Sequence, residues 1–324
     1  MNRGPVTAPP RIPGEVIDPP PRELPEKLHR IDQSGGAAAT TLGVGARAYL
    51  RYSRVRGSLL AAGTTYYLFL AVFSLIAFAY GIAAILGADQ VAKYLTEAIT
   101  KAFPGLLGDN ALDPQQLRAV GQTTSVLGLL ALVYSGSGGM AAASASLHLI
   151  YGMPRDPRPF LVARTRLLAW LLVIGPLIVL SFVASTIIVA FADRISSRVG
   201  LDTSSGRFML SLVGILLTLA VDFLIVYLLL GLLGGIRPPR RPRMIGAAAG
   251  AVAMEILKSL MAVLIGFSVN EPRYGAFAAP IGMLFVLYLQ TTALYGSAAL
   301  TAGIAERDVP IGELAPVATD PVDG

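Results

Sequence analysis

Three charged side chains interrupt long apolar runs and are the first candidates for chemistry in this sequence. Asp222 lies near the middle of one run, and Glu255 and Lys258 lie in the next. A charged side chain near the centre of a bilayer costs roughly 2.5–3.5 kcal/mol, so it usually faces protein or water. Carboxylates and an ammonium group in that setting can bind a polar ligand or take part in proton transfer.

Glu255 and Lys258 stand three residues apart, which places them on one face of a helix and close enough to pair. One interpretation is a binding or proton-linked site inside a helix bundle. The other is a mutually neutralising pair that fixes helix packing. The sequence favours neither.

Asp222 shares a helix face with Thr218, and we expect this polar stripe to face the interior of the bundle. One interpretation pairs Asp222 with Lys258, which leaves Glu255 as the group that takes up a proton. The other is a protonated carboxyl group that only packs. A functional role is favoured because burying an unpaired carboxylate for structure alone is costly.

Other polar residues in the apolar runs are weaker candidates. Gln290, Tyr66 and Tyr67 could line a polar cavity, but hydrogen bonding between helices explains them equally well. The chain has no cysteine and only two histidines, so neither a thiolate site nor a His-rich metal site is expected. We assign no cofactor, no metal and no catalytic residue.

The composition indicates what must position these side chains. Hydrophobic residues make up 54% of the 324 residues, and charged residues make up 14%. A typical soluble domain has a charged fraction of about 25%. The chain therefore lacks the charges to cover a soluble surface, and the composition indicates an integral membrane protein.

Six apolar runs each reach the roughly 20 residues that a helix needs to cross hydrocarbon. They extend over residues 59–86, 126–151, 167–192, 208–236, 244–269 and 277–304. The pattern predicts an all-α polytopic bundle of about six transmembrane helices over residues 45–306. Glycines are compatible with such helices, although Ser135–Gly139 is a weak spot, and we interpret Gly246-x-x-x-Gly250 as a tight contact within one chain.

The flanking segments are polar. Residues 1–44 are expected to form a disordered tail, since eight prolines occur in the first thirty residues, and residues 307–324 form a short acidic tail. Gly45–Arg56 has the pattern of a helix lying on the membrane surface. The residues from Val91 to Phe103 are typical of a second short surface helix.

Basic residues gather between alternate runs. We expect the following arginines to meet anionic headgroups: Arg47, Arg51, Arg54, Arg237, Arg240, Arg241 and Arg243. Eighteen Lys and Arg residues fall on one side of the predicted membrane and seven on the other. The positive-inside rule then predicts that both termini lie in the cytoplasm. We expect the protein in the bacterial plasma (inner) membrane. The expected partners are membrane lipids, not nucleic acid.

Two stretches carry a family resemblance. The residues from Ala62 to Ala77 resemble the tyrosine-bearing stretch of the YihY/virulence factor BrkB family, with Ala77 where the family usually has proline. The segment from Arg243 to Lys258 is similar to the family's fifth apolar run. Glu255 and Lys258 are retained there, and Met254 replaces a tryptophan.

Two further stretches agree in order and spacing, so the resemblance covers about residues 45 to 305. Leu147–Tyr151 resembles the family's junction after the second run, with His148 in place of asparagine. Tyr274–Leu289 is similar to the family's last run, although Ser297 and Ala298 follow Gly296 where the family often has glutamate. The resemblance implies an integral membrane protein.

Members of that family were once described as ribonuclease BN, but the residues do not support this activity. Phosphodiester cleavage needs a metal cluster or an acid–base pair at a wet surface, and the basic loops offer little besides arginine. Nucleotide-binding and hydrolase motifs do not occur either. We therefore expect no enzyme. The first hypothesis is a transporter or flippase-like protein for an amphipathic or envelope-related molecule, and the alternative is a non-transporting scaffold for envelope assembly.

Overall fold

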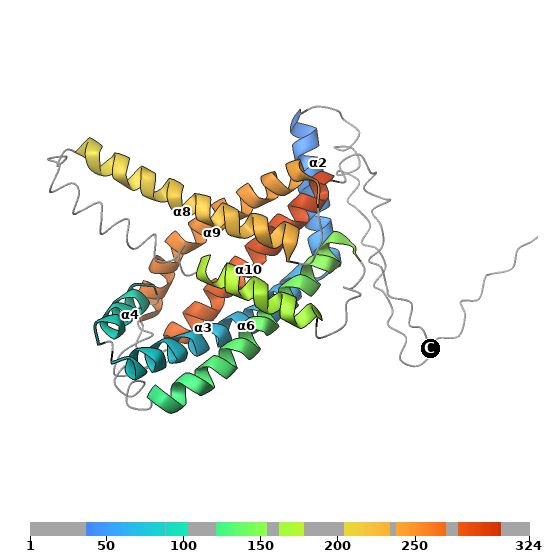
Figure 1. Cartoon of the computed structure of the whole chain (residues 1–324). Coiled ribbons are helices and arrows are strands. Elements are labelled where there is room, and N and C mark those ends of the chain that lie inside the picture. The colour runs from blue at the N-terminus through green and yellow to red at the C-terminus, as the bar shows by residue number, and fades with distance from the viewer. Residues whose placement is uncertain are drawn as a thin grey trace, which may run out of the picture.

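The computed structural model describes residues 37–87, 89–102, 121–153, 162–177, 204–233, 238–269 and 278–305. Every regular element in these ranges is helical (Figure 1). The helices are α2 (Ala37–Arg54), α3 (Gly57–Ile85), α4 (Asp89–Ala102), α6 (Gly121–Tyr151), the segment 162–177, α8 (Ser204–Leu232), α9 (Arg240–Val269) and α10 (Ala278–Ala305). The predicted all-α class is confirmed.

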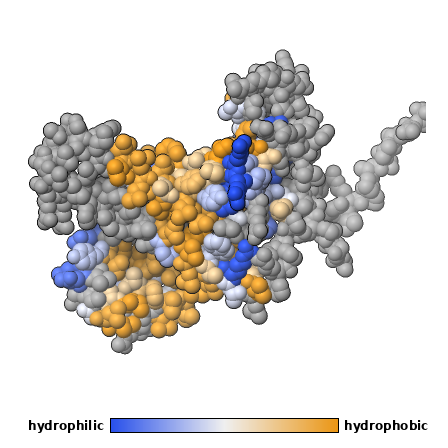
Figure 2. Space-filling view, turned by 45° about the horizontal axis from the view of Figure 1, so that its top comes forward, coloured by the Kyte–Doolittle hydropathy of each residue, from blue (hydrophilic) through white to orange (hydrophobic). Residues whose placement is uncertain are grey.

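Four helices of the described part are long and apolar enough to cross a membrane. They are Gly57–Ile85, Val126–Tyr151, Leu212–Gly231 and Pro280–Ala305. Only 28% of the apolar stretch in α3 is buried inside the protein, so most of its side chains face outward. Figure 2 shows the same on the surface, where a broad hydrophobic area lies between two hydrophilic flanks. Apolar area on this scale needs lipid around it, and the chain is a polytopic membrane protein.

The predicted count of six spans is only partly tested by these residues. α9 is 30 residues long, but its described side chains include five charged ones, and it is not among the four. The predicted run 167–192 is helical as far as residue 177, and its remainder lies outside the described residues. The predicted tail 307–324 lies outside them, as does the predicted tail 1–44 up to residue 36, whereas residues 37–44 are helical.

The two short helices predicted to lie on the membrane surface are formed, with one corrected boundary. α2 begins at Ala37 and not at Gly45, because the alanines that open it are strong helix formers. The chain then turns into α3 at Arg56, whose φ of 52° is left-handed. α4 confirms the predicted short helix, and the hydroxyl groups of Tyr80 and Thr96 join it to α3 at 2.6 Å.

α3 and α6 form the closest helix pair, and they run antiparallel (Figure 1). A Cβ atom on Gly128 would stand 2.8 Å from the backbone nitrogen of Phe78, and Gly138 lies under the ring of Tyr67. The glycine-rich segment 135–139 is therefore no weak spot: it is continuous helix and fully buried. Small residues allow this close approach.

The GxxxG motif of α9 makes the tight contact within one chain that the sequence predicted, and its partner is α10. Gly246 lies against Thr301 and the carbonyl oxygen of Ser297, and Gly250 lies against Ser297 and Val226. α9 therefore packs against α10 on one side and against α8 on the other. Both contacts are within one chain.

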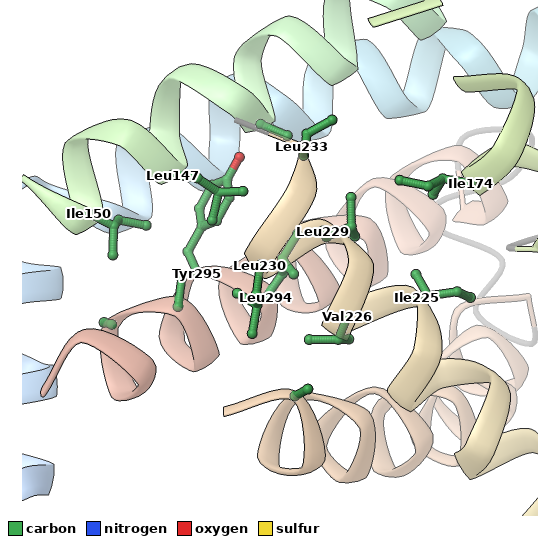
Figure 3. Packing of buried hydrophobic residues seen from close by; sticks show 14 of the residues in the cluster. Leu147, Ile150, Ile174, Ile225, Val226, Leu229, Leu230, Leu233, Leu294 and Tyr295 are labelled. Atoms are coloured by element: carbon green, nitrogen blue, oxygen red, sulfur yellow. The ribbon is translucent and has the colours of Figure 1, made fainter. Parts of the chain in front are cut away.

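The largest apolar cluster fills the space between these helices. Figure 3 shows Ile225, Val226, Leu229 and Leu230 of α8 facing Leu294 and Tyr295 of α10, with Leu147 and Ile150 of α6 and Ile174 of the segment 162–177 around them. The segment 162–177 is thereby fixed to the bundle. Its neighbour α8 is held in place from two sides, which matters for the polar residues that α8 carries.

Candidate functional site

Lys258 of α9 joins two carboxylates on two different helices. Its Nζ lies 2.7 Å from Oδ1 and 2.6 Å from Oδ2 of Asp222 on α8. The same Nζ lies 3.6 Å from Oε2 of Glu255, three residues earlier on α9. The pairing of Glu255 with Lys258 and that of Asp222 with Lys258 were separate expectations, and the structure contains both at once.

Thr218 closes the group on the side of α8. Its hydroxyl donates to Oε1 of Glu255 at 3.2 Å, and it also lies 3.0 Å from the carbonyl oxygen of Ile215. Four of the five predicted site residues therefore form one cluster, which we call the charge cluster: Thr218, Asp222, Glu255 and Lys258. α8 and α9 are therefore joined by two polar contacts, the Asp222–Lys258 ion pair and the Thr218–Glu255 hydrogen bond.

The charge cluster is largely enclosed by protein, and Asp222 places it at the middle of a membrane span. Asp222 stands centrally in the 20-residue span Leu212–Gly231, and its side chain is 2% exposed. The Lys258 side chain is 12% exposed and that of Glu255 is 20% exposed. Of the two acidic side chains, Asp222 is closed off and Glu255 is the more exposed, although the Oε2 atom of Glu255 is itself buried.

Gln290 is not part of this cluster. It lies half-buried on α10, and the hydrogen bonds described above run between α8 and α9 without it. α10 instead uses other polar residues, which sequence reasoning missed. The hydroxyl groups of Tyr295 and Thr64 lie 2.5 Å apart, and Thr65 donates to Thr291 at 3.4 Å. No local pattern signals these contacts, since the partners are more than 200 residues apart in sequence.

Two of the arginines predicted to meet lipid headgroups are buried in protein, which corrects that part of the prediction. Arg47 is 5% exposed and Arg243 is 9% exposed. Arg47 lies beside Gly303 of α10, where the missing side chain leaves room for α2 to approach. Arg240 and Arg241 are exposed, Arg51 and Arg54 are half-buried, and Arg237 lies outside the described residues.

Arg243 instead fastens the start of α9 to the end of α8. Its guanidinium carbon lies 3.6 Å from the centre of the Tyr227 ring, and its Nε donates to the Tyr227 carbonyl oxygen at 3.0 Å. Gly231, one turn later on α8, has no side chain and leaves the space that the guanidinium group fills. A stacked cation of this kind stabilises a helix pair.

Metal binding was the other kind of chemistry considered from the sequence. Within the residues that the structure describes, no three His, Asp, Glu or Cys side chains lie together in a way that could hold a metal ion. The Nδ1 atom of His148 lies 2.8 Å from the carbonyl oxygen of Ser144 on its own helix. A hydrogen bond of this kind, within one helix, is typical of a histidine side chain that packs in the bundle.

Apolar spans around a buried ionic group define a class: a polytopic α-helical membrane protein with an intramembrane charge cluster. The family model described as virulence factor BrkB matches residues 48–320, which is most of the chain. The chain belongs to the virulence factor BrkB family. Comparison with curated proteins and with solved structures gave no significant match.

Proposed function

We propose that this membrane protein is a transporter or flippase-like protein that moves an amphipathic or envelope-related molecule. The observation that carries the proposal is the position of Lys258 between Asp222 and Glu255 at the middle of a span. Ionisable groups at that depth are costly and most often mark a path for a substrate or a proton. In this proposal the chain is a carrier and not an enzyme.

Glu255 is the group in the cluster that meets the polar part of the substrate. It is ten times more exposed than Asp222, at 20% against 2%, and it lies farther from Nζ of Lys258, at 3.6 Å against 2.6 Å. Asp222 holds Lys258 in place, and Thr218 orients the Glu255 carboxylate. Substrate entering at Glu255 would compete with Thr218 for the carboxylate and so weaken this hydrogen bond between α8 and α9.

The proposed setting is the plasma (inner) membrane of a bacterium, with both termini in the cytoplasm. Support comes from the end of the bundle where α6, α8 and α10 finish and α3 and α9 begin. Arg51, Arg54, Arg56, Arg240 and Arg241 all lie at these helix ends. Basic residues gathered at one end indicate the cytoplasmic side, and membrane lipids are the proposed partners there.

A strain that lacks the gene tests this function. The lipid composition of both leaflets is measured after complementation with the parent, with Glu255→Gln, and with the double variant Asp222→Asn/Lys258→Gln, which removes both charges of the shorter pair. Glu97→Gln on the exposed face of α4 is the matched control.

The expected result is restoration by the parent and the control and failure by the two cluster variants at equal protein level. Full restoration by both cluster variants would mean that the charges only pack, as the scaffold alternative requires.

A further inference from the structure

The four residues of the charge cluster can pair in two different ways. In the structure, Lys258 of α9 pairs with Asp222 of α8. The hydroxyl group of Thr218 on α8 donates to Glu255 of α9. Because both contacts run from one helix to the other, we call them the crossing pairs. Each helix also carries two members of the cluster that can pair with each other, Thr218 with Asp222 and Glu255 with Lys258, and we call these the same-helix pairs.

The same-helix pairs are within reach of the side chains as the helices stand. Asp222 follows Thr218 by four residues on α8, and residues at this spacing share a helix face. Lys258 follows Glu255 by three residues on α9, so the same holds there. Helical side chains point back toward the start of the helix, which directs the later member of each pair toward the earlier one. On α9 the contact exists already, since Nζ of Lys258 lies 3.6 Å from Oε2 of Glu255.

The two oxygens of Glu255 serve different partners. Oε1 accepts the hydrogen bond of Thr218, whereas the contact with Lys258 is made at Oε2. A donor that replaced Thr218 at Oε1 would leave the contact at Oε2 in place. Glu255 can therefore bind a polar group of the substrate and Lys258 at the same time.

α8 is anchored in the bundle by its second half. Five residues there belong to the largest apolar cluster: Ile225, Val226, Leu229, Leu230 and Leu233. Five large apolar side chains before the charge cluster are exposed instead: Leu212, Val213, Ile215, Leu216 and Leu217. Figure 1 shows the start of α8 lying apart from the end of α9. The charge cluster thus lies where the anchored half of α8 gives way to the half that has room to pivot.

We propose that the charge cluster is a partner-exchange switch that lets α8 pivot on α9. When a polar group of the substrate takes the place of Thr218 at Glu255, Thr218 turns to Asp222 and Lys258 moves to Glu255. The same-helix pairs then replace the crossing pairs, and the helices can separate. A buried charge that loses its partner is strongly unfavourable, and the exchange avoids this for Lys258. The inference rests on the proposed function for its role in transport, though not for the exchange itself.

The state with the crossing pairs is the more stable of the two. Lys258 lies 2.6 Å from Asp222 but 3.6 Å from Glu255. The exchange also gives Asp222 a hydroxyl donor in place of an ammonium group, and hydrogen bonds from a charged donor are the stronger ones. The exchanged state is therefore the minor one. A substitution that weakens only one set of pairs shifts its population.

Distances between nitroxide labels on α8 and α9 test the exchange by electron paramagnetic resonance. The chain has no native cysteine, so the labels attach only at Val213→Cys on α8 and Leu260→Cys on α9, which are both exposed positions. The labelled full-length chain is reconstituted in vesicles of phosphatidylethanolamine and phosphatidylglycerol. We expect a main short distance and a minor longer one, which belongs to the exchanged state.

Two substitutions in this labelled chain should act in opposite directions. Asp222→Asn weakens a crossing pair, while its amide still accepts from Thr218, so the long-distance fraction should rise several-fold. Glu255→Gln removes the same-helix partner of Lys258, while its amide still accepts from Thr218, so the long-distance fraction should fall several-fold. Glu97→Gln on the exposed face of α4 is the matched control and should change neither distance.

A cluster that only packs would loosen with either substitution. A change in the same direction for both variants, or a single distance in the parent, would therefore overturn the proposal. If Asp222→Asn does not fold, Glu255→Gln decides alone: a fall in the long-distance fraction supports the exchange, and a rise or no change overturns it.

The two proposals fail separately. Opposite shifts in a protein that does not restore the deletion strain would keep the exchange and remove its role in transport. Restoration that depends on Glu255 without opposite shifts would keep the proposed function and remove the exchange.

Discussion

Lys258 holds two helices together through one nitrogen atom. Both oxygens of Asp222 lie within 2.7 Å of it, and the pair is almost fully enclosed, with side-chain exposures of 12% and 2%. A buried charge that loses its partner is strongly unfavourable, whereas removing both charges together is often tolerated. The pair is therefore expected to behave as a unit.

A double-mutant cycle measures this coupling. Lys258→Gln should lower the free energy of unfolding by about 3–5 kcal/mol, since it leaves Asp222 buried without its partner. Asp222→Asn should cost less, since Lys258 keeps Glu255 at 3.6 Å. The double variant should cost clearly less than the sum of the two. Unfolding of the purified protein in a denaturing detergent gives the three values, and strict additivity would contradict a direct pair.

Arg243 is expected to be a stability residue and not a lipid contact. Arg243→Ala removes a charged hydrogen bond and a stacked cation from Tyr227, and should cost about 2–4 kcal/mol of unfolding free energy. Arg243→Lys keeps the charge but loses the planar stacking, so it should recover only part of this. Arg240→Ala, at an exposed neighbour, is the control and should change stability little. Equal effects of the two alanine variants would contradict the buried position.

The sequence allowed the charge cluster to be predicted because charge in an apolar run is conspicuous, and because helical spacing relates Thr218 to Asp222 and Glu255 to Lys258. It did not allow the burial of Arg47 or Arg243 to be predicted. A basic residue at a helix end has the same local pattern whether it faces headgroups or a neighbouring helix. The space that accepts Arg243 is made by Gly231, and only the packing of α8 on α9 brings the two together.

Glycine positions decide how closely the helices pack. The runs of apolar residues predicted α3, α6, α8, α9 and α10 closely, since length and hydropathy are local properties. The partners of each helix are set by matching surfaces, and a run of small residues such as 135–139 gives no indication of which helix will face it. For this reason it was predicted as a weak spot, whereas it forms the close contact with α3.

Gly128→Ala should separate α3 from α6. The added Cβ atom would stand 2.8 Å from the backbone nitrogen of Phe78 and 3.1 Å from its Cα atom, and backbone cannot rotate away. Overpacking of this kind typically costs about 1–3 kcal/mol. Gly63→Ala on α3 meets nothing within 4 Å and is the control, which should be neutral or slightly stabilising. Thermal unfolding in detergent compares them, and equal stability would contradict the close approach.

Among the residues that the structure describes, most arginines at helix ends gather at one end of the bundle. The described helix ends place Arg51, Arg54, Arg240 and Arg241 together there, whereas α4 lies after the far end of α3. The proposed orientation therefore puts α4 outside the cytoplasm.

Cysteine labelling checks this orientation, and the absence of native cysteine makes the background clean. Lys93→Cys on the exposed face of α4 should react in intact cells with a reagent that does not cross the membrane. Arg241→Cys should react only after the cells are opened. Labelling of Arg241→Cys in intact cells, and of Lys93→Cys only in opened cells, would mean that the protein has the opposite orientation.

The central claim is that the charge cluster takes part in moving an amphipathic molecule, and lipid translocation in vesicles tests it most directly. Protein is reconstituted with fluorescent phosphatidylethanolamine, and a reductant that cannot cross the bilayer reports how fast the inner-leaflet probe reaches the outside. We predict rapid translocation by the parent and by Glu97→Gln, and rates near those of protein-free vesicles for Glu255→Gln and for Asp222→Asn/Lys258→Gln. Equal rates for all four proteins, or a parent no faster than empty vesicles, would contradict the claim.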